Sequence, residues 1–179
     1  MTKFFPLVLC LFLFACDNNK KDEAATPAAA ETAAAPVELA DAKYIEIGKA
    51  GLNALSANEI PKWMESYADN ALYRWNNGDS LAGKPAISEY WSKRRNESID
   101  SISFANDIWL PVKVNTPVNE FQAPGVWLLG WYQVTAKYKT GRTMTQWIHT
   151  DIHFDANDKI DITIQYLDRV PINAAMMAK

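Results

Sequence analysis

Residues 126–154 read VWLLGWYQVTAKYKTGRTMTQWIHTDIHF. Apolar and polar side chains alternate on both sides of Thr140-Gly141, and this period of two is typical of β-strands. A turn at Thr140-Gly141 joins the two runs. The stretch therefore predicts an antiparallel hairpin with strands near 126–139 and 142–154.

The register of this hairpin decides which side chains face the core. The turn indicates a pairing of Tyr138 with Thr143. Further along, this register places Trp131 opposite Thr150, Leu129 opposite Ile152 and Trp127 opposite Phe154. We expect this more apolar face to meet the helices, and the other face to carry Tyr132 opposite His149, Gly130 opposite Asp151 and Leu128 opposite His153. A shift of one residue would exchange the two faces.

The remaining elements define the class of fold. Two further strands are expected near 99–114 and 159–168. Apolar residues recur at helical spacing from Val37 to Leu55, Asn58 can cap a second helix, and Pro85 suits the start of a third helix. Leu72 to Trp75 is a short strand candidate. Helices followed by an antiparallel sheet indicate an α+β fold.

Three motifs resemble those of the nuclear transport factor 2-like, or SnoaL-like, superfamily. They are Tyr67-Ala68-Asp69-Asn70-Ala71, Gly83-Lys84-Pro85-Ala86-Ile87, and Phe154-Asp155-Ala156-Asn157-Asp158-Lys159-Ile160 followed by Tyr166-Leu167-Asp168. The resemblance covers residues 37 to 168. It implies a cone-shaped half-barrel, in which three N-terminal helices pack on a curved antiparallel sheet and enclose a pocket. It does not specify the chemistry.

The N-terminus indicates export. The apolar run from Phe4 to Ala15 is too short to span a bilayer and reads as a signal peptide. Leu13-Phe14-Ala15-Cys16 resembles a lipobox, although Phe14 is bulkier than that motif's usual residue. The resemblance implies that residues 1–16 hold the signal and that Cys16 carries lipid; an ordinary secretory signal is the alternative. The expected location is the cell envelope, lipid-anchored in the outer membrane on its periplasmic or surface side.

Composition divides the rest of the chain. Residues 17–36 are rich in Ala, Pro, Thr, Glu and Lys without apolar periodicity, so we expect a disordered tether. Residues 37–179 then form one domain without a cysteine. The net charge of −3 argues against nucleic acid as a partner, and no motif indicates a cofactor.

Candidate pocket residues combine aromatic side chains with a few polar groups, as small-molecule sites do. They are Tyr44, Tyr67, Asp69, Trp75, Trp127, Trp131, Gln133, Thr150 and Ile152. A filled core is the alternative. For Asp69, a structural role in a turn is favoured over that of a general base.

Ketosteroid isomerase, an enzyme of the resembled superfamily, provides a comparison of catalytic positions. Ala42-Lys43-Tyr44-Ile45-Glu46 resembles its helix with the oxyanion-hole tyrosine, which Tyr44 matches. The position of its carboxylate base falls on Trp75, and that of its protonated acid falls on Thr150. An indole cannot act as a base, so steroid-type isomerisation is not expected and the catalytic residues stay unknown. Cyclase or dehydratase chemistry stays open.

His149, Asp151 and His153 alternate along one expected strand. In a strand, residues four apart are about 13 Å from each other, so the three cannot bind one metal ion, and no metal is expected. A polar outer face with Trp147, Tyr132 and His149, used by a homodimer through the sheet, is the preferred interpretation. Lys93-Arg94-Arg95 is interpreted as a basic helix end that complements the helix dipole.

The sequence thus leads to three functional hypotheses. The first is an envelope lipoprotein whose pocket binds a small apolar or aromatic molecule without conventional catalysis. The second is an enzyme of the cyclase, isomerase or dehydratase type. The third is a non-catalytic subunit that binds other proteins.

Overall fold

The structure is a computed structural model that describes residues 34–119 and 122–177. The proposed signal peptide, Cys16 and most of the proposed tether lie outside the described residues. Residues from Ala34 onward form a compact unit of their own, which contains the helices and strands of the described residues and both of their hydrophobic clusters. This unit has the interior that a chain needs to fold by itself. Within the described ranges, no helix is long and apolar enough to cross a membrane.

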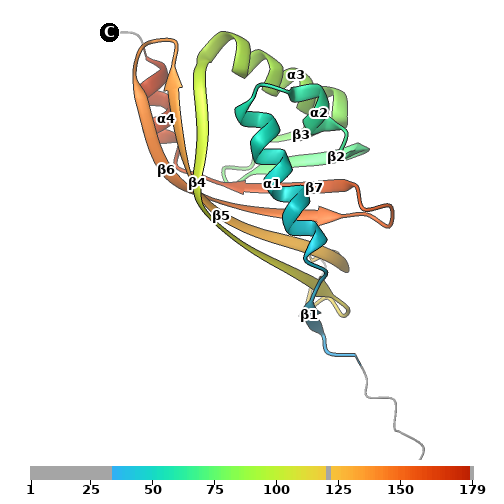
Figure 1. The fold of residues 1–179 in the computed structure, drawn as a ribbon. Helices are drawn as coiled ribbons and strands as arrows, with labels where there is room; N and C mark the ends of the chain where they lie inside the picture. Colours follow the sequence, from blue (N-terminus) through green and yellow to red (C-terminus); the bar gives the residue numbers. More distant parts are fainter. Residues whose placement is uncertain (1–33, 120–121, 178–179) are drawn as a thin grey trace, which may run out of the picture. The chain divides into compact units, whose positions relative to one another are not determined.

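Four helices and a seven-stranded sheet make up this unit, as Figure 1 shows. The helices are α1 (Lys43–Ser56), α2 (Ile60–Met64), α3 (Lys84–Lys93), which continues into a turn of π-helix η1 (Arg94–Ser98), and α4 (Arg169–Met176). The strands are β1 (Val37–Leu39), β2 (Tyr67–Trp75), β3 (Ser80–Ala82), β4 (Ile99–Val114), β5 (Gly125–Tyr138), β6 (Thr143–Phe154) and β7 (Ile160–Tyr166). The α+β class is confirmed.

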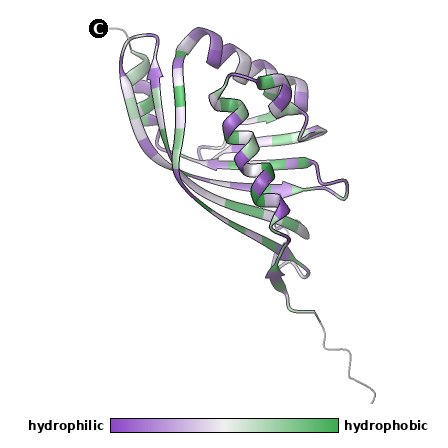
Figure 2. Ribbon diagram, viewed as in Figure 1, coloured by the Kyte–Doolittle hydropathy of each residue, from purple (hydrophilic) through white to green (hydrophobic). Residues whose placement is uncertain are grey.

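The sheet has the order β1-β4-β5-β6-β7-β2-β3 and is not closed. All neighbouring strands run antiparallel except β2 and β7, which pair in parallel and make the sheet mixed. The long strands bend, and α1, α2 and α3 lie over their concave side (Figure 1). Both apolar and hydrophilic residues occur along each part of α1 (Figure 2), as in an amphipathic helix that packs one face on a sheet.

Two differences from the expected elements concern the ends of the unit. Residues 37–39 are not the start of the first helix but an edge strand, β1, paired with β4. The helix α4 was not expected. Its signal is Asp168, whose carboxylate accepts a hydrogen bond from the Val170 amide at 2.8 Å as an N-cap, with Pro171 in the first turn.

The register of the β5–β6 hairpin differs by one residue from the expected one. The Tyr138 amide donates to the Arg142 carbonyl at 2.8 Å, and Lys137, not Tyr138, pairs with Thr143. The connection is therefore a three-residue loop in which Gly141 takes a left-handed φ of 84°. Such a loop is a turn closed by a bulge. The expected pairing missed this bulge and was wrong.

The shift exchanges the two faces of β5. Leu128, Tyr132, Val134, Ala136 and Tyr138 are buried toward the helices. The expectation that Trp127, Leu129 and Trp131 face the helices was therefore wrong. On β6 the expected faces are confirmed, with Thr150 and Ile152 inside and His149 and Asp151 outside.

Gly130 lets an indole cross the concave face of the sheet. Trp109 of β4 pairs with Gly130 of β5, and its ring covers the glycine. A Cβ atom built on Gly130 would lie 2.3 Å from Trp109 Cζ3, and one built on Gly48 of α1 would lie 3.0 Å from the same atom. Trp109 is therefore packed between the sheet and α1, and neither glycine tolerates a larger residue without movement.

Gly130→Ala should lower the free energy of unfolding by about 1–3 kcal/mol, because the added methyl group overpacks the contact with Trp109. Urea unfolding of both proteins measures the loss. In a Trp109→Ala background the same substitution should cost much less, since the clashing ring is gone. An equal cost in both backgrounds would contradict this account of Gly130.

Candidate functional site

A cavity of about 290 Å³ lies between the concave face of the sheet and the helices. Residues of both hydrophobic clusters of the unit line it. Its volume is at the lower end of the range of about 300–1,000 Å³ that is usual for ligand pockets. The space therefore suits a small molecule rather than a large one.

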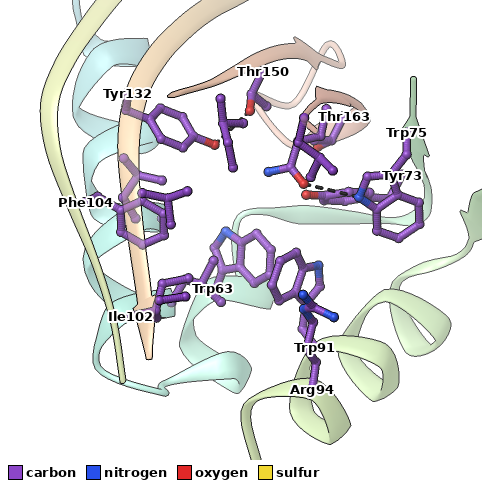
Figure 3. Close-up of a pocket in the computed structure, with 18 of the residues that line it drawn as sticks. Trp63, Tyr73, Trp75, Trp91, Arg94, Ile102, Phe104, Tyr132, Thr150 and Thr163 are labelled. Atoms are coloured by element: carbon purple, nitrogen blue, oxygen red, sulfur yellow. Dashed lines mark hydrogen bonds between the residues drawn. The ribbon is translucent and has the colours of Figure 1, made fainter. Parts of the chain in front are cut away.

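Aromatic side chains dominate the lining, as Figure 3 shows. They come from α2, α3 and three different strands and are Trp63, Tyr67, Tyr73, Trp75, Tyr90, Trp91, Phe104, Trp109, Tyr132 and Tyr138. Trp63 packs edge-on against both Tyr67 and Trp91, with ring centroids 5.3 and 5.6 Å apart. Such edge-to-face contacts hold the rings in defined orientations.

Three hydrogen bonds between side chains connect the polar groups on the sheet side of the cavity. The Tyr132 hydroxyl lies 2.7 Å from Thr150 Oγ1, and the Tyr67 hydroxyl lies 3.3 Å from Thr163 Oγ1. Trp75 Nε1 donates to Gln165 Oε1 at 3.2 Å (Figure 3). These groups meet because β5, β6, β7 and β2 are neighbours in this order, so their inward residues lie close together.

The tyrosine hydroxyls of the cavity are held in the neutral form. Burial raises the pKa of Tyr67, Tyr73 and Tyr132 above the usual value of a phenol. Among the residues that the structure describes, the lining includes no carboxylate and no imidazole. The cavity can therefore hydrogen-bond a ligand, but it has no side chain suited to act as a general base at neutral pH.

Four of the expected pocket residues line the cavity: Tyr67, Trp75, Thr150 and Ile152. Trp75 and Thr150 are also the positions that correspond to the base and the acid of ketosteroid isomerase. Neither side chain can exchange a proton with carbon at neutral pH. Among the described lining residues, none therefore provides the carboxylate base that steroid-type isomerisation needs.

Tyr44 is buried but does not line the cavity. Its hydroxyl donates to Asp158 Oδ1 at 2.6 Å, and Lys43 Nζ lies 2.6 Å from Oδ2 of the same carboxylate. These two donors lower the pKa of Asp158. Tyr44 therefore ties α1 to the β6–β7 turn, and its hydroxyl is already engaged there.

The remaining expected pocket residues lie elsewhere. The Asp69 side chain is fully exposed in β2, 3.9 Å from Lys84 Nζ. Trp127, Trp131 and Gln133 are on the outer face of β5, because the one-residue shift of the hairpin turns them away from the helices. In place of Trp131, Tyr132 lines the cavity. The alternation of β5 was visible in the sequence, but its phase was not.

The outer face of the sheet holds the two histidines. His149 stacks between Trp131 and Tyr166, with ring centroids 4.6 and 5.4 Å away, and its Nε2 lies 2.8 Å from Asp151 Oδ1. His153 Nδ1 lies 2.6 Å from Asp161 Oδ1. In the described part of the chain, no three His, Cys, Asp or Glu side chains lie close enough together to hold a metal ion.

Large apolar side chains are exposed on this outer face. Ile108 is 58% exposed, Trp147 is 52% exposed, and Leu110 and Tyr166 are also exposed. Tyr132, which was expected here, is instead buried on the other side. Pairing of two copies of the chain through this face stays a prediction.

No protein-family model and no curated protein sequence matches this chain, but solved structures do. An LEH-like epoxide hydrolase of M. tuberculosis has a TM-score of 0.56 and 13% identity, covering 74% of this chain and 87% of that one. A protein of Pseudomonas putida KT2440 proposed to be a polyketide cyclase has a TM-score of 0.59 and 14% identity, with 74% and 96% covered. An NTF2-like protein of unknown function from Burkholderia pseudomallei K96243 has a TM-score of 0.58 and 13% identity, with 75% and 97% covered.

Identities this low show the fold alone, and proteins with different activities share it. The resemblance that the sequence motifs indicated is thus confirmed at the level of the fold: the unit has a nuclear transport factor 2-like, or SnoaL-like, fold. What it does must be argued from the cavity.

The buried tyrosines predict that the protein loses stability in alkali. Tyrosines of the unfolded chain ionise near pH 10, whereas burial keeps Tyr67, Tyr73 and Tyr132 protonated to higher pH. The stabilising effect is fully present below about pH 10 and is lost as the pH rises above it. Urea unfolding between pH 8 and pH 11 should show this decline. Tyr67→Phe should make it shallower, and an unchanged slope in this variant would exclude Tyr67 as a cause of the decline.

Proposed function

We propose that this protein binds a small apolar or aromatic molecule in its cavity and does so without acid–base catalysis. The observation that carries the proposal is the lining itself. It is a set of interlocked aromatic rings around an open volume, with its sheet-side polar groups paired to one another. Cavities of this kind bind organic ligands by apolar burial and use a few polar groups for orientation.

A cavity-filling substitution tests this function. Ala136 of β5 is buried and lines the cavity, whereas its neighbour Thr135 faces outward. N-phenyl-1-naphthylamine is an uncharged, apolar fluorescent probe, and we expect it to bind the protein. Ala136→Leu should lower its affinity about tenfold, because the new side chain occupies apolar contact area worth about 1.4 kcal/mol.

Thr135→Leu is the matched control, since it adds a leucine to the same strand on the opposite face. It should leave the affinity for the probe unchanged. Circular dichroism confirms that both variants are folded. Equal loss in the two variants, or no binding by the unchanged protein, would contradict a ligand site in the cavity.

An enzyme of the cyclase, isomerase or dehydratase type is the second candidate. The fold of the neighbouring structures supports it, since one is an epoxide hydrolase and another is proposed to be a polyketide cyclase. Such reactions need an acid or a base beside the reacting atoms. The described lining offers only hydroxyl, amide, indole and guanidinium groups, so simple binding is the better supported function. Conversion of a bound molecule by the purified protein would reverse this order.

We further propose that the protein is anchored in the cell envelope through lipid on Cys16. The support is the short apolar run before Cys16 and the abrupt change to polar residues after it. Cys16→Ser should abolish incorporation of labelled palmitate and release the protein from the membrane fraction. Cys10→Ser is the matched control, because Cys10 lies inside the apolar run that the signal peptidase removes. Palmitate labelling that survives Cys16→Ser would disprove this anchor.

A further inference from the structure

One end of the cavity is basic. Within the described part of the chain, Arg94 and Arg169 are the only charged residues of the lining. Arg94 follows α3, and Arg169 begins α4. The opposite polar groups, on β6 and β7, are uncharged hydroxyl and amide groups. A ligand in this cavity is therefore exposed to the guanidinium groups of Arg94 and Arg169 and, within the described lining, to no carboxylate.

The guanidinium of Arg94 has only neutral acceptors. Nη2 donates to the Tyr138 hydroxyl at 3.3 Å, and Nη1 lies 3.8 Å from Met176 Sδ. None of the carboxylates in residues 34–119 and 122–177 forms an ion pair with it. An arginine is always charged, and partial burial of a charge is costly without a partner. Arg94 is thus a cation beside an apolar cavity that still lacks a counter-ion.

Two further donors near this end have no acceptor. Trp91 is 7% exposed and lines the cavity, and its Nε1 is buried without a hydrogen-bond partner. Trp91 and Arg94 lie three residues apart on one helical segment and so share a face, as Figure 3 shows. Arg169 Nε is likewise buried without a partner, although its Nη2 is paired with Asp79 Oδ2 at 3.0 Å. The buried lining atoms without a partner, Trp91 Nε1 and Arg169 Nε, are both donors.

From this arrangement we propose that the ligand is an amphipathic anion: a compact apolar or aromatic body with a single carboxylate. The carboxylate binds Arg94 and accepts a hydrogen bond from Trp91 Nε1, and the body lies among Trp63, Ile102 and Phe104. The inference rests on the proposed binding function and adds the charge of the ligand. A guanidinium and an indole N–H together match the oxygens of a carboxylate, which would satisfy both groups at once.

Two probes of the same shape test the charge. They are 1-naphthaleneacetate and its uncharged isostere 1-naphthaleneacetamide, titrated by calorimetry against residues 34–179. The protein should bind the acetate about tenfold more tightly than the amide, since a charge-assisted hydrogen bond is stronger than a neutral one. Arg94→Met should reduce this preference to about threefold or less, since only the hydrogen bond from Trp91 Nε1 then favours the carboxylate.

Lys93→Met is the matched control, because it removes the same charge from the adjacent, exposed residue. It should preserve the preference for the acetate. Trp91→Phe removes the indole N–H but keeps an aromatic ring, and it should weaken the acetate about threefold more than the amide. This second variant keeps the test valid if Arg94→Met does not fold.

The outcomes separate the two proposals. Equal affinities for the two probes in the unchanged protein would overturn the anionic ligand and leave the binding function standing. A preference that is lost equally in Lys93→Met and Arg94→Met would also overturn it, because the attraction would then be long-range. Failure of both probes to bind, together with failure of the uncharged fluorescent probe, would overturn both proposals.

Discussion

The bulged turn between β5 and β6 is the constraint on which the rest of the molecule depends. Gly141 adopts the left-handed conformation there, and the Tyr138 amide donates to the Arg142 carbonyl. Because side chains in a strand alternate between faces, this single turn decides that Tyr132 and Val134 point toward the helices while Trp131 points away. The expected two-residue turn, one residue shorter, would instead place Trp127 and Trp131 on the face toward the helices.

The same register gives the two sides of the sheet different roles. Inside, Gly130 leaves room for Trp109 to lie across β5 and contact α1, so the cavity has an aromatic wall on the sheet as well as on the helices. Outside, His149 and His153 pair with carboxylates, and several large apolar side chains are exposed. The histidine–carboxylate pairs, which are the most evident acid–base groups in the sequence, therefore lie on the outer face. The cavity retains hydroxyl, amide, indole and guanidinium groups, which suit recognition better than proton transfer.

Several features could be predicted from local pattern because local pattern causes them. The period of two along 99–114 coincides with β4, and the α+β order of elements follows from the change of period after the third helix. Other features could not. The Tyr44 hydroxyl donates a hydrogen bond to Asp158, 114 residues further along the chain, and no local sequence pattern predicts this contact. Arg94 was interpreted as complementing a helix end, and its position beside the cavity depends on α4, which packs against β6 far along the chain.

The sequence by itself determined the class of fold and the approximate bounds of the long strands, because these follow from periodicity and residue type. Only the tertiary structure decided which face of β5 is buried and which residues meet at the cavity. The physical reason is that alternate residues of a strand face opposite sides of the sheet, and the alternation alone does not say which set faces the core. The choice between them is made by one left-handed glycine in a turn and by the packing of distant elements, neither of which a local pattern contains.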